Sequence, residues 1–266
     1  MRPLRALAKL ALALAHALAG WFTIRLLFPR WSHQRREATV QVWAQRMLRI
    51  LGIPLQVQGT APAIGPVLLV ANHLSWLDIL VLHAARHCRF VAKADVRHWP
   101  LIGTLATGGG TLYIERERRR DAMRVVHRMA EGLRAGQIVA VFPEGTTGDG
   151  RTLLPFHANL VQAALSAGAP VQPVALRFVD AASGEDSPGP LYLGEDTLLS
   201  SLWRTLAGPP FVAHVRFGIP QHAQGRDRRR WAEDLRAAVE RLRDWKTELP
   251  DAELAKVTQR PQKSSL

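Results

Sequence analysis

Short apolar runs alternate with longer amphipathic segments from about residue 54 to residue 245 of the chain. Short apolar runs are typical of buried strands, and segments whose apolar residues recur every three or four positions are typical of helices. The predicted strands are 55–58, 67–71, 89–92, 111–114, 138–142, 171–178 and 212–217. The predicted helices are 77–86, 101–107, 119–134, 157–167 and 227–245. This alternation predicts a layered α/β domain.

The first fifty residues follow a different pattern. Residues 10–24 form an apolar run without charge, because its one titratable residue, His16, is counted as neutral. This run is short for a straight membrane span, which needs about 20 apolar residues. A second, amphipathic run follows over residues 40–51. The segment therefore predicts a pair of N-terminal helices.

The positive charge of the chain is concentrated in the same segment. The chain has 35 Lys and Arg against 22 Asp and Glu, a net charge of +13, and residues 1–50 hold nine of the basic residues but only one acid, Glu37. Four aromatic residues lie among these arginines: Trp21, Phe22, Phe28 and Trp31. Each basic residue near anionic headgroups contributes ~1 kcal/mol to membrane binding, and aromatic rings favour the membrane interface. We therefore expect the helical pair to dock on a membrane, as a monotopic or single-helix anchor.

Three other interpretations of the basic N-terminal segment were weighed. A secretory signal peptide would combine the basic start, the apolar run and a cleavage site near residues 17–19. Two ordinary core helices would give the same periodicity. Nucleic acid is another polyanion, but the chain has no zinc-finger spacing or RNA-recognition signature, and no nucleic-acid partner is expected.

The composition is that of a globular protein, with 47% hydrophobic and 21% charged residues. The single cysteine, Cys88, excludes an internal disulfide, a zinc ribbon and an iron–sulfur cluster. His83 and His87 have the spacing of metal ligands on a helix, but no third ligand is evident nearby, and a solvated helix face is favoured for them.

Polar residues follow the predicted strand 67–71, in the run Asn72-His73-Leu74-Ser75-Trp76-Leu77-Asp78. On one continuous helix His73 and Asp78 would lie on different faces, so they can meet only if His73 lies on a loop and Asp78 in the first turn after it. The spacing of Ser75 and Asp78 is that of a capping box, which would begin the helix between them. The alternative is that Asp78 is only a helix cap and His73 an ordinary loop histidine.

Four blocks of the sequence, taken in order, resemble those of the glycerolipid acyltransferases, specifically the bacterial 1-acyl-glycerol-3-phosphate acyltransferases. The first is the His-x4-Asp motif of His73 and Asp78, and the resemblance extends over about residues 54–217. The other blocks are Gly110-Thr111-Leu112-Tyr113-Ile114-Glu115-Arg116, Phe142-Pro143-Glu144-Gly145-Thr146 and Val171-Gln172-Pro173-Val174. Four ordered motifs are far more specific than any one of them.

The resemblance implies transfer of a fatty acyl chain from acyl-carrier protein or acyl-CoA to the free hydroxyl of 1-acyl-sn-glycerol-3-phosphate, giving phosphatidic acid at the cytoplasmic face of the inner membrane. It assigns the phosphate of the acceptor to Arg116, and Lys93 offers a second positive charge. Glu144 is expected to contact acceptor hydroxyls. The remaining residues expected in the substrate site are Asn72, Ser75, Gly145 and Thr146. Neither a metal nor a cofactor other than the acyl donor is expected.

The residue types suit this chemistry. A hydroxyl acceptor needs a general base, and histidine titrates close to neutral pH. His73 is the expected base, and Asp78 would orient its ring and stabilise the imidazolium as it forms. The thioester is already activated, so no covalent acyl-enzyme is expected. Gly145 would let backbone N–H groups approach the oxyanion closely.

Thr147 stands where the third block of the family commonly has an arginine. The departure raises an alternative acceptor, lyso-ornithine lipid, whose acyltransferases resemble this extended Thr-Thr-x-Asp-Gly form. An alternative of another class is a membrane-binding protein without catalytic activity. A hydrolase elbow around Ser166 is disfavoured, because Ser166 ends a helical pattern and Gly168 suits its C-cap.

The expected organisation has three parts. Residues 1–52 form the membrane-associated helices, residues 53–248 form an acyltransferase domain with a central mixed sheet flanked by helices, and residues 249–266 form a flexible tail.

Overall fold

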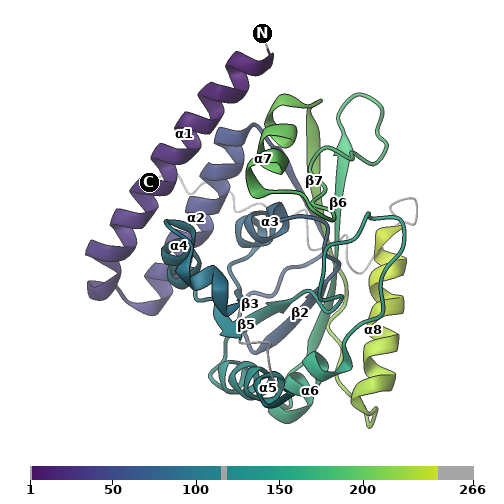
Figure 1. Cartoon of the computed structure of the whole chain (residues 1–266). Helices are drawn as coiled ribbons and strands as arrows, with labels where there is room; N and C mark the ends of the chain where they lie inside the picture. The colour runs from purple at the N-terminus through teal and green to yellow at the C-terminus, as the bar shows by residue number, and fades with distance from the viewer. Residues whose placement is uncertain (1, 115–118, 245–266) are drawn as a thin grey trace, which may run out of the picture.

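The computed structural model describes residues 2–114 and 119–244, and in this part of the chain a seven-stranded sheet lies between helices (Figure 1). The strand order is β1-β7-β6-β2-β5-β3-β4. Neighbouring strands run parallel from β6 to β4, β7 runs antiparallel to β6, and β1 runs parallel to β7. The sheet is therefore mixed, as expected. The predicted tail, residues 249–266, lies outside the described residues.

All seven predicted strands are present, with ends that differ from the prediction by no more than one or two residues. In chain order they are β1 (Leu55–Gln58), β2 (Val67–Ala71), β3 (Arg89–Lys93), β4 (Leu112–Ile114), β5 (Ile138–Val141), β6 (Val171–Asp180) and β7 (Phe211–Phe217).

The helices are α1 (Arg2–Phe22), α2 (His33–Leu51), α3 (Leu77–Ala85), α4 (Ile102–Gly108), α5 (Arg119–Arg134), α6 (Ala158–Ala167), α7 (Leu198–Ala207) and α8 (Arg228–Arg243). A π-helical turn at Thr23–Leu27 and 3₁₀ turns at Phe28–Arg30 and Ala94–His98 complete the helical segments. The five helices predicted between residues 77 and 245 are all confirmed.

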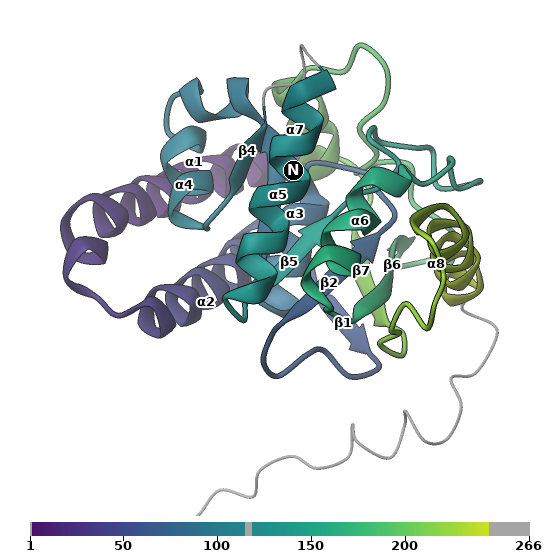
Figure 2. The same ribbon diagram turned by 90° about the horizontal axis from the view of Figure 1, so that it is seen from below.

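Helices cover both faces of the sheet, and its central strand β2 has apolar side chains on both sides. The side chains of β2 alternate: Leu68 and Val70 belong to the core beneath α5, α6 and α8, whereas Leu69 and Ala71 belong to the core beneath α2 and α3. Figure 2 views the molecule with α5 and α6 on the near side and α3 on the far side. This burial on two faces is typical of a parallel strand flanked by helices.

The helix α1 is longer than the predicted run 10–24, because it extends through the flanking basic residues. It packs against α2 through small residues: Ala13 and Ala17 are buried, and a Cβ added to Gly20 would lie 2.6 Å from Nε1 of Trp43. His16, the polar residue within the apolar run, stacks on the Trp43 ring and lies 3.1 Å from its backbone carbonyl. The outward face carries exposed large residues, among them Leu4, Leu7, Leu12, Leu14, Leu18 and Phe22.

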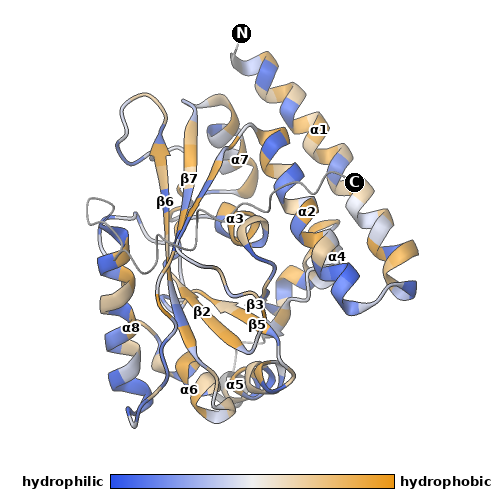
Figure 3. Cartoon of the chain, turned by 180° about the vertical axis from the view of Figure 1, so that it is seen from behind, coloured by the Kyte–Doolittle hydropathy of each residue, from blue (hydrophilic) through white to orange (hydrophobic). Residues whose placement is uncertain are grey.

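Residues 3–30 form a helix long and apolar enough to cross a membrane, and Figure 3 shows apolar colouring along much of α1. The helix lies along the folded domain, in contact with α2, α4 and α7. In contrast, α2 contributes buried apolar residues to the core on its inner face, namely Ala44, Met47, Leu48 and Leu51.

The sequence pattern did not predict α7. In this helix Ser201 and Thr205 are buried, whereas Leu199 is 75% exposed and Trp203 is 40% exposed. The inner face also carries Leu206, which is buried in the core, and Leu202, which packs against it. Because large apolar side chains lie on both faces, the run does not show the single apolar face by which a surface helix is recognised.

We predict that Trp231→Ala lowers the free energy of unfolding by about 3–5 kcal/mol, because this side chain is fully buried between α8 and the sheet and its loss leaves a cavity. Urea unfolding in detergent measures the change. Trp99→Ala, at a site 47% exposed, is the matched control and should cost far less. Equal losses for the two variants would contradict the assignment of α8 to the core.

Candidate active site

His73 and Asp78 lie in the connection between β2 and α3, at the carboxyl end of the central strand. His73 is on the loop and Asp78 is in the first turn of α3, which is the arrangement required by their spacing. The distance between His73 Nδ1 and Asp78 Oδ2 is 2.8 Å. The structure therefore brings the predicted pair into hydrogen-bond contact.

Asp78 is fully buried, and its Oδ2 atom also accepts hydrogen bonds from the backbone N–H groups of Leu74 at 2.6 Å and Ser75 at 2.9 Å. The bond from the Ser75 N–H is one half of the predicted capping box. The Ser75 hydroxyl accepts from the N–H of Leu77 and not from that of Asp78. One carboxylate oxygen thus bends the chain, begins α3 and contacts the imidazole.

A second group fixes the plane of the His73 ring. The ring stacks on Phe142, with centroids 4.0 Å apart and planes 8° from parallel, and the side chain is 21% exposed. Phe142 follows β5, the parallel neighbour of β2. The imidazole is therefore held at its edge by a carboxylate and on its face by an aromatic ring, while part of it remains accessible.

Glu144 is buried directly beside His73. Its Oε1 accepts from the N–H of His73 and its Oε2 from the N–H of Leu154, both at 2.9 Å. Burial raises the pKa of this carboxyl, and the two backbone hydrogen bonds act in the opposite direction. Glu144 was expected to contact the acceptor; the structure shows it bonded to the backbone of the histidine loop. The sequence could not reveal these two contacts, because His73 and Leu154 lie 71 and 10 residues from Glu144 in the chain.

The turn that contains Gly145 requires a glycine. Its φ is +75°, and an added Cβ would lie 2.9 Å from Nε2 of His157. Its N–H donates to the carbonyl of Phe142. Thr146 is exposed beside it, and the Thr147 hydroxyl donates to the carbonyl of Tyr192 at 2.5 Å. Thr147 therefore holds the 144–150 loop against the segment that precedes α7.

Asn72 is buried at the end of β2, where its side chain bonds to β6. The carboxamide nitrogen donates to the carbonyl of Leu176 at 3.0 Å, and its oxygen accepts from the Leu176 N–H at 2.8 Å. Both polar ends of Asn72 thus join the end of β2 to the middle of β6.

The second block lies at the edge of the sheet. Lys93 is exposed at the end of β3, where it pairs in register with Ile114 at the end of β4. Arg116 lies outside the described residues. The parallel pairing brings Lys93 next to the strand that leads to Arg116.

The prediction that His83 and His87 form a solvated helix face is wrong. His83 is 7% exposed and His87 is 6% exposed, and their rings stack with centroids 5.3 Å apart. Burial lowers the pKa of His83 to about 3, with a further contribution from His87. Gly109 lies against both rings: its carbonyl is 3.3 Å from His87 Nε2, and an added Cβ would lie 3.3 Å from His83 Nε2. Within the described residues no group of three or more side chains could hold a metal ion.

These rings continue a column that begins at His73. Phe142 stacks on Phe90 with centroids 5.7 Å apart, and Phe90 meets the edge of His83 at 5.0 Å. His87 at the far end lies 3.7 Å from Glu37 of α2. A packed series of rings therefore connects His73 to the N-terminal helices.

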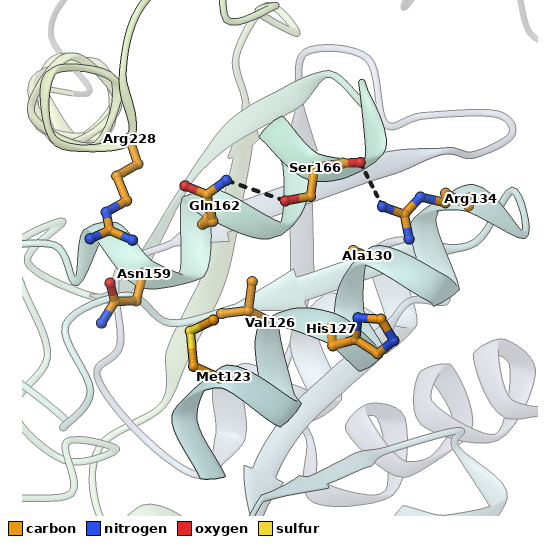
Figure 4. A pocket seen from close by; sticks show the side chains of 9 residues that line it. All are labelled: Met123, Val126, His127, Ala130, Arg134, Asn159, Gln162, Ser166 and Arg228. Atoms are coloured by element: carbon orange, nitrogen blue, oxygen red, sulfur yellow. Dashed lines mark hydrogen bonds between the residues drawn. The ribbon is translucent and has the colours of Figure 1, made fainter. Parts of the chain in front are cut away.

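Two cavities lie away from the sheet core. One, of about 270 Å³, is next to the histidine loop, and its walls include Leu74 and charged side chains of both signs, namely Asp149, Arg151, Arg177, Asp186 and Arg243. The other is a groove of about 460 Å³ between α5 and α6, which no predicted site residue lines (Figure 4). We assign the first to the candidate site because Leu74, the residue that follows His73 in the chain, lines it.

Ser166 lines the α5–α6 groove, where its hydroxyl accepts from Gln162 and its carbonyl accepts from Arg134 (Figure 4). It lies in the last turn of α6, which ends at Gly168 with φ +64°. As the sequence pattern predicted, this helix end does not form the strand-to-helix turn of a hydrolase elbow.

Comparisons with known proteins agree with the motifs. Residues 54–177 match the acyltransferase family model. The chain is 39% identical to a lyso-ornithine lipid O-acyltransferase of Pseudomonas aeruginosa, over 90% of this chain and 91% of that protein. It is 37% identical to a 1-acyl-sn-glycerol-3-phosphate acyltransferase of Neisseria meningitidis, over 73% of this chain and 76% of that protein.

The fold has a counterpart among solved structures. The crystal structure of the 1-acyl-sn-glycerophosphate acyltransferase PlsC from Thermotoga maritima superposes with a TM-score of 0.71, at 20% identity, and covers 94% of this chain and 100% of that one. The relatives include both kinds of acceptor that the sequence left open. The chain therefore belongs to the lysophospholipid acyltransferase family and is a lysolipid O-acyltransferase of lipid biosynthesis.

Proposed function

We propose that the protein transfers a fatty acyl chain from acyl-carrier protein or acyl-CoA to the free hydroxyl of lyso-ornithine lipid. The similarity to a lyso-ornithine lipid O-acyltransferase along 90% of the chain carries this proposal. It reverses the order of preference drawn from the sequence, which placed 1-acyl-sn-glycerol-3-phosphate first. Thr147, in the position commonly held by an arginine, supports the same acceptor.

The surroundings of Thr147 add a physical reason. Its hydroxyl is engaged by the Tyr192 carbonyl, so this position supplies a loop contact and no positive charge. The cavity lined by Leu74 of the histidine loop presents carboxylates and guanidinium groups together. Charges of both signs suit an amino-acid headgroup, which carries an ammonium and a carboxylate, better than a phosphate monoester.

His73 acts as the general base in the proposed reaction, and Asp78 orients it. With Nδ1 directed at the Asp78 carboxylate, Nε2 takes the proton of the acceptor hydroxyl as its oxygen bonds to the thioester carbon. The buried carboxylate stabilises the imidazolium. The tetrahedral intermediate then releases the thiol, which receives the proton from His73, and the ester remains. No residue of the chain becomes acylated.

A second candidate is 1-acyl-sn-glycerol-3-phosphate O-acyltransferase, whose product is phosphatidic acid. The similarity to the Neisseria enzyme of that name favours it, and so does the position of Lys93 beside the strand that leads to Arg116. Lys93 would supply one positive charge to a phosphate, and the family resemblance assigns the other to Arg116.

We also place the enzyme on the cytoplasmic face of the inner membrane, with α1 in the bilayer. The outer face of α1 carries large apolar residues, while its inner face packs on the domain through alanines. A helix held along the domain in this way suits a monotopic attachment better than a separate spanning anchor. Residues 1–52 are thus a membrane-docking unit whose second helix also completes the core.

The mechanism predicts that His73→Ala lowers kcat by ~10²-fold or more, since the general base is removed. Asp78→Asn should also lower kcat strongly, because an amide favours the wrong tautomer of His73. Turnover of the purified variants measures both effects, with circular dichroism to verify folding. A folded His73→Ala enzyme with unchanged turnover would show that another group is the base.

The acceptor proposal predicts a higher kcat/KM for lyso-ornithine lipid than for 1-acyl-sn-glycerol-3-phosphate, measured with the purified full-length chain and one acyl donor. Thr147→Arg should lower kcat/KM for lyso-ornithine lipid by about three- to tenfold, because it removes the bond to Tyr192. Thr147→Ser keeps the hydroxyl and is the control. A clear preference for the phosphate-bearing acceptor would establish the second candidate instead.

The proposed attachment predicts that Leu14→Glu combined with Leu18→Glu reduces binding to vesicles of phosphatidylethanolamine and phosphatidylglycerol, because both side chains are exposed on the outer face of α1. Co-sedimentation measures binding, and high salt alone should leave the unchanged chain bound. Ile64→Glu combined with Met123→Glu, at exposed apolar sites elsewhere, is the control. Equal binding by both double variants would place the attachment outside α1.

A further inference from the structure

One segment of the chain, residues 142–148 after β5, contacts both the ring and the backbone of His73. Phe142 stacks on the imidazole, with centroids 4.0 Å apart. Glu144 Oε1 accepts a hydrogen bond from the His73 N–H at 2.9 Å. The Gly148 N–H donates to the His73 carbonyl at 2.8 Å. The imidazole and both backbone polar groups of His73 are therefore held by a single turn.

The carboxylate of Glu144 is enclosed within this turn. The residue is 6% exposed, and its second oxygen accepts from the N–H of Leu154 at 2.9 Å. A Cβ added to Gly148 would lie 3.7 Å from this oxygen and 3.8 Å from the His73 carbonyl, so the turn closes over both. Each carboxylate oxygen thus has a backbone donor, and little of the group is accessible to a hydroxyl of a bound substrate.

The backbone of His73 depends on such contacts because it lies between β2 and α3, outside regular secondary structure. Asp78 bonds the ring of His73 and the backbone N–H groups of Leu74 and Ser75. Glu144 bonds the backbone of His73 itself. A displacement of about 1 Å in a reacting group can cost ~10²-fold in rate, so the support of the backbone bears directly on proton transfer.

We propose that Glu144 is a positioning residue for the general base and not a ligand of the acceptor. Its carboxylate holds the His73 backbone so that Nε2 of the ring reaches the acceptor hydroxyl. The proposal rests on the general-base role proposed for His73, and it replaces the acceptor contact expected for Glu144 from the sequence. Because Glu144 acts on the enzyme and not on the substrate, its loss lowers turnover by the same factor for every acceptor.

Kinetics of Glu144→Gln in the purified full-length chain test the proposal. The amide has the length of the carboxyl but offers one oxygen to two backbone N–H groups, so it cannot hold both. We expect kcat to fall by about ten- to a hundredfold, equally for lyso-ornithine lipid and 1-acyl-sn-glycerol-3-phosphate, with the KM of each acceptor unchanged. A higher KM with little change in kcat would show that Glu144 binds the acceptor, and an unchanged kcat would also overturn the proposal.

Asp227→Asn is the matched control. Asp227 begins α8, and its carboxylate likewise accepts from two backbone N–H groups, those of Arg229 and Arg230. The same carboxyl-to-amide change there should leave kcat and KM unchanged, and equal losses in the two variants would contradict a specific role for Glu144. Circular dichroism verifies folding. If Glu144→Gln does not fold, Glu144→Asp, which keeps the charge but is one methylene shorter, should show the same fall in kcat at constant KM.

Proton NMR provides a readout of His73 that does not depend on the acceptor. The Nδ1 proton held 2.8 Å from Asp78 resonates downfield of the backbone amides, and its absence from His73→Ala identifies it. We expect Glu144→Gln to shift or broaden this signal and Asp227→Asn to leave it in place. A signal unmoved by Glu144→Gln would overturn the positioning role alone. Full turnover by His73→Ala would instead overturn the general-base mechanism, and the positioning role with it.

Discussion

The three hydrogen bonds accepted by one oxygen of Asp78 organise the active site. Two come from the backbone of Leu74 and Ser75, and one comes from His73. The backbone bonds end the extended course of β2 and start α3, so the carboxylate that contacts the histidine also holds the turn on which that histidine lies. The short spacing of the two side chains fits this double contact. Structure and chemistry here depend on the same atom.

The sheet and the histidine–aspartate contact could both be predicted because they depend on local sequence. Strands of apolar residues between turns define the seven-stranded sheet, and the ends of parallel strands lie at one edge. The capping spacing of Ser75 and Asp78 predicts where α3 begins. The roles of the wider site residues depend on contacts across the sheet. Asn72 and Glu144 illustrate this, since their partners include Leu176 and His73, which lie far from them in the sequence.

Other features could not be predicted because the periodicity of the sequence does not record environment. His83 is a polar residue in the apolar pattern of α3 and His87 follows that helix, and only their contacts with each other, with Phe90 and with Gly109 show that both are buried. In α7 large apolar residues lie on both faces, so the pattern shows no single inner stripe. Composition did reveal the unusual character of α1, since its leucines lie beside an excess of basic residues. The acceptor proposed for the enzyme rests in part on Thr147, where the family motif itself changes.

The long sequence separation of the bonds around His73 has a consequence for biosynthesis. Its loop is held by Glu144 at a separation of 71 residues, Asn72 is bonded to Leu176 at a separation of 104, and the carbonyl of Leu74 accepts from the N–H of Tyr192. Contacts between such distant segments form slowly, because the intervening chain must first be ordered. A ribosome-bound chain that ends before Glu144 therefore has α1 and its histidine motif but lacks all three of these contacts. The attachment proposed for α1 can thus precede activity during synthesis of the protein.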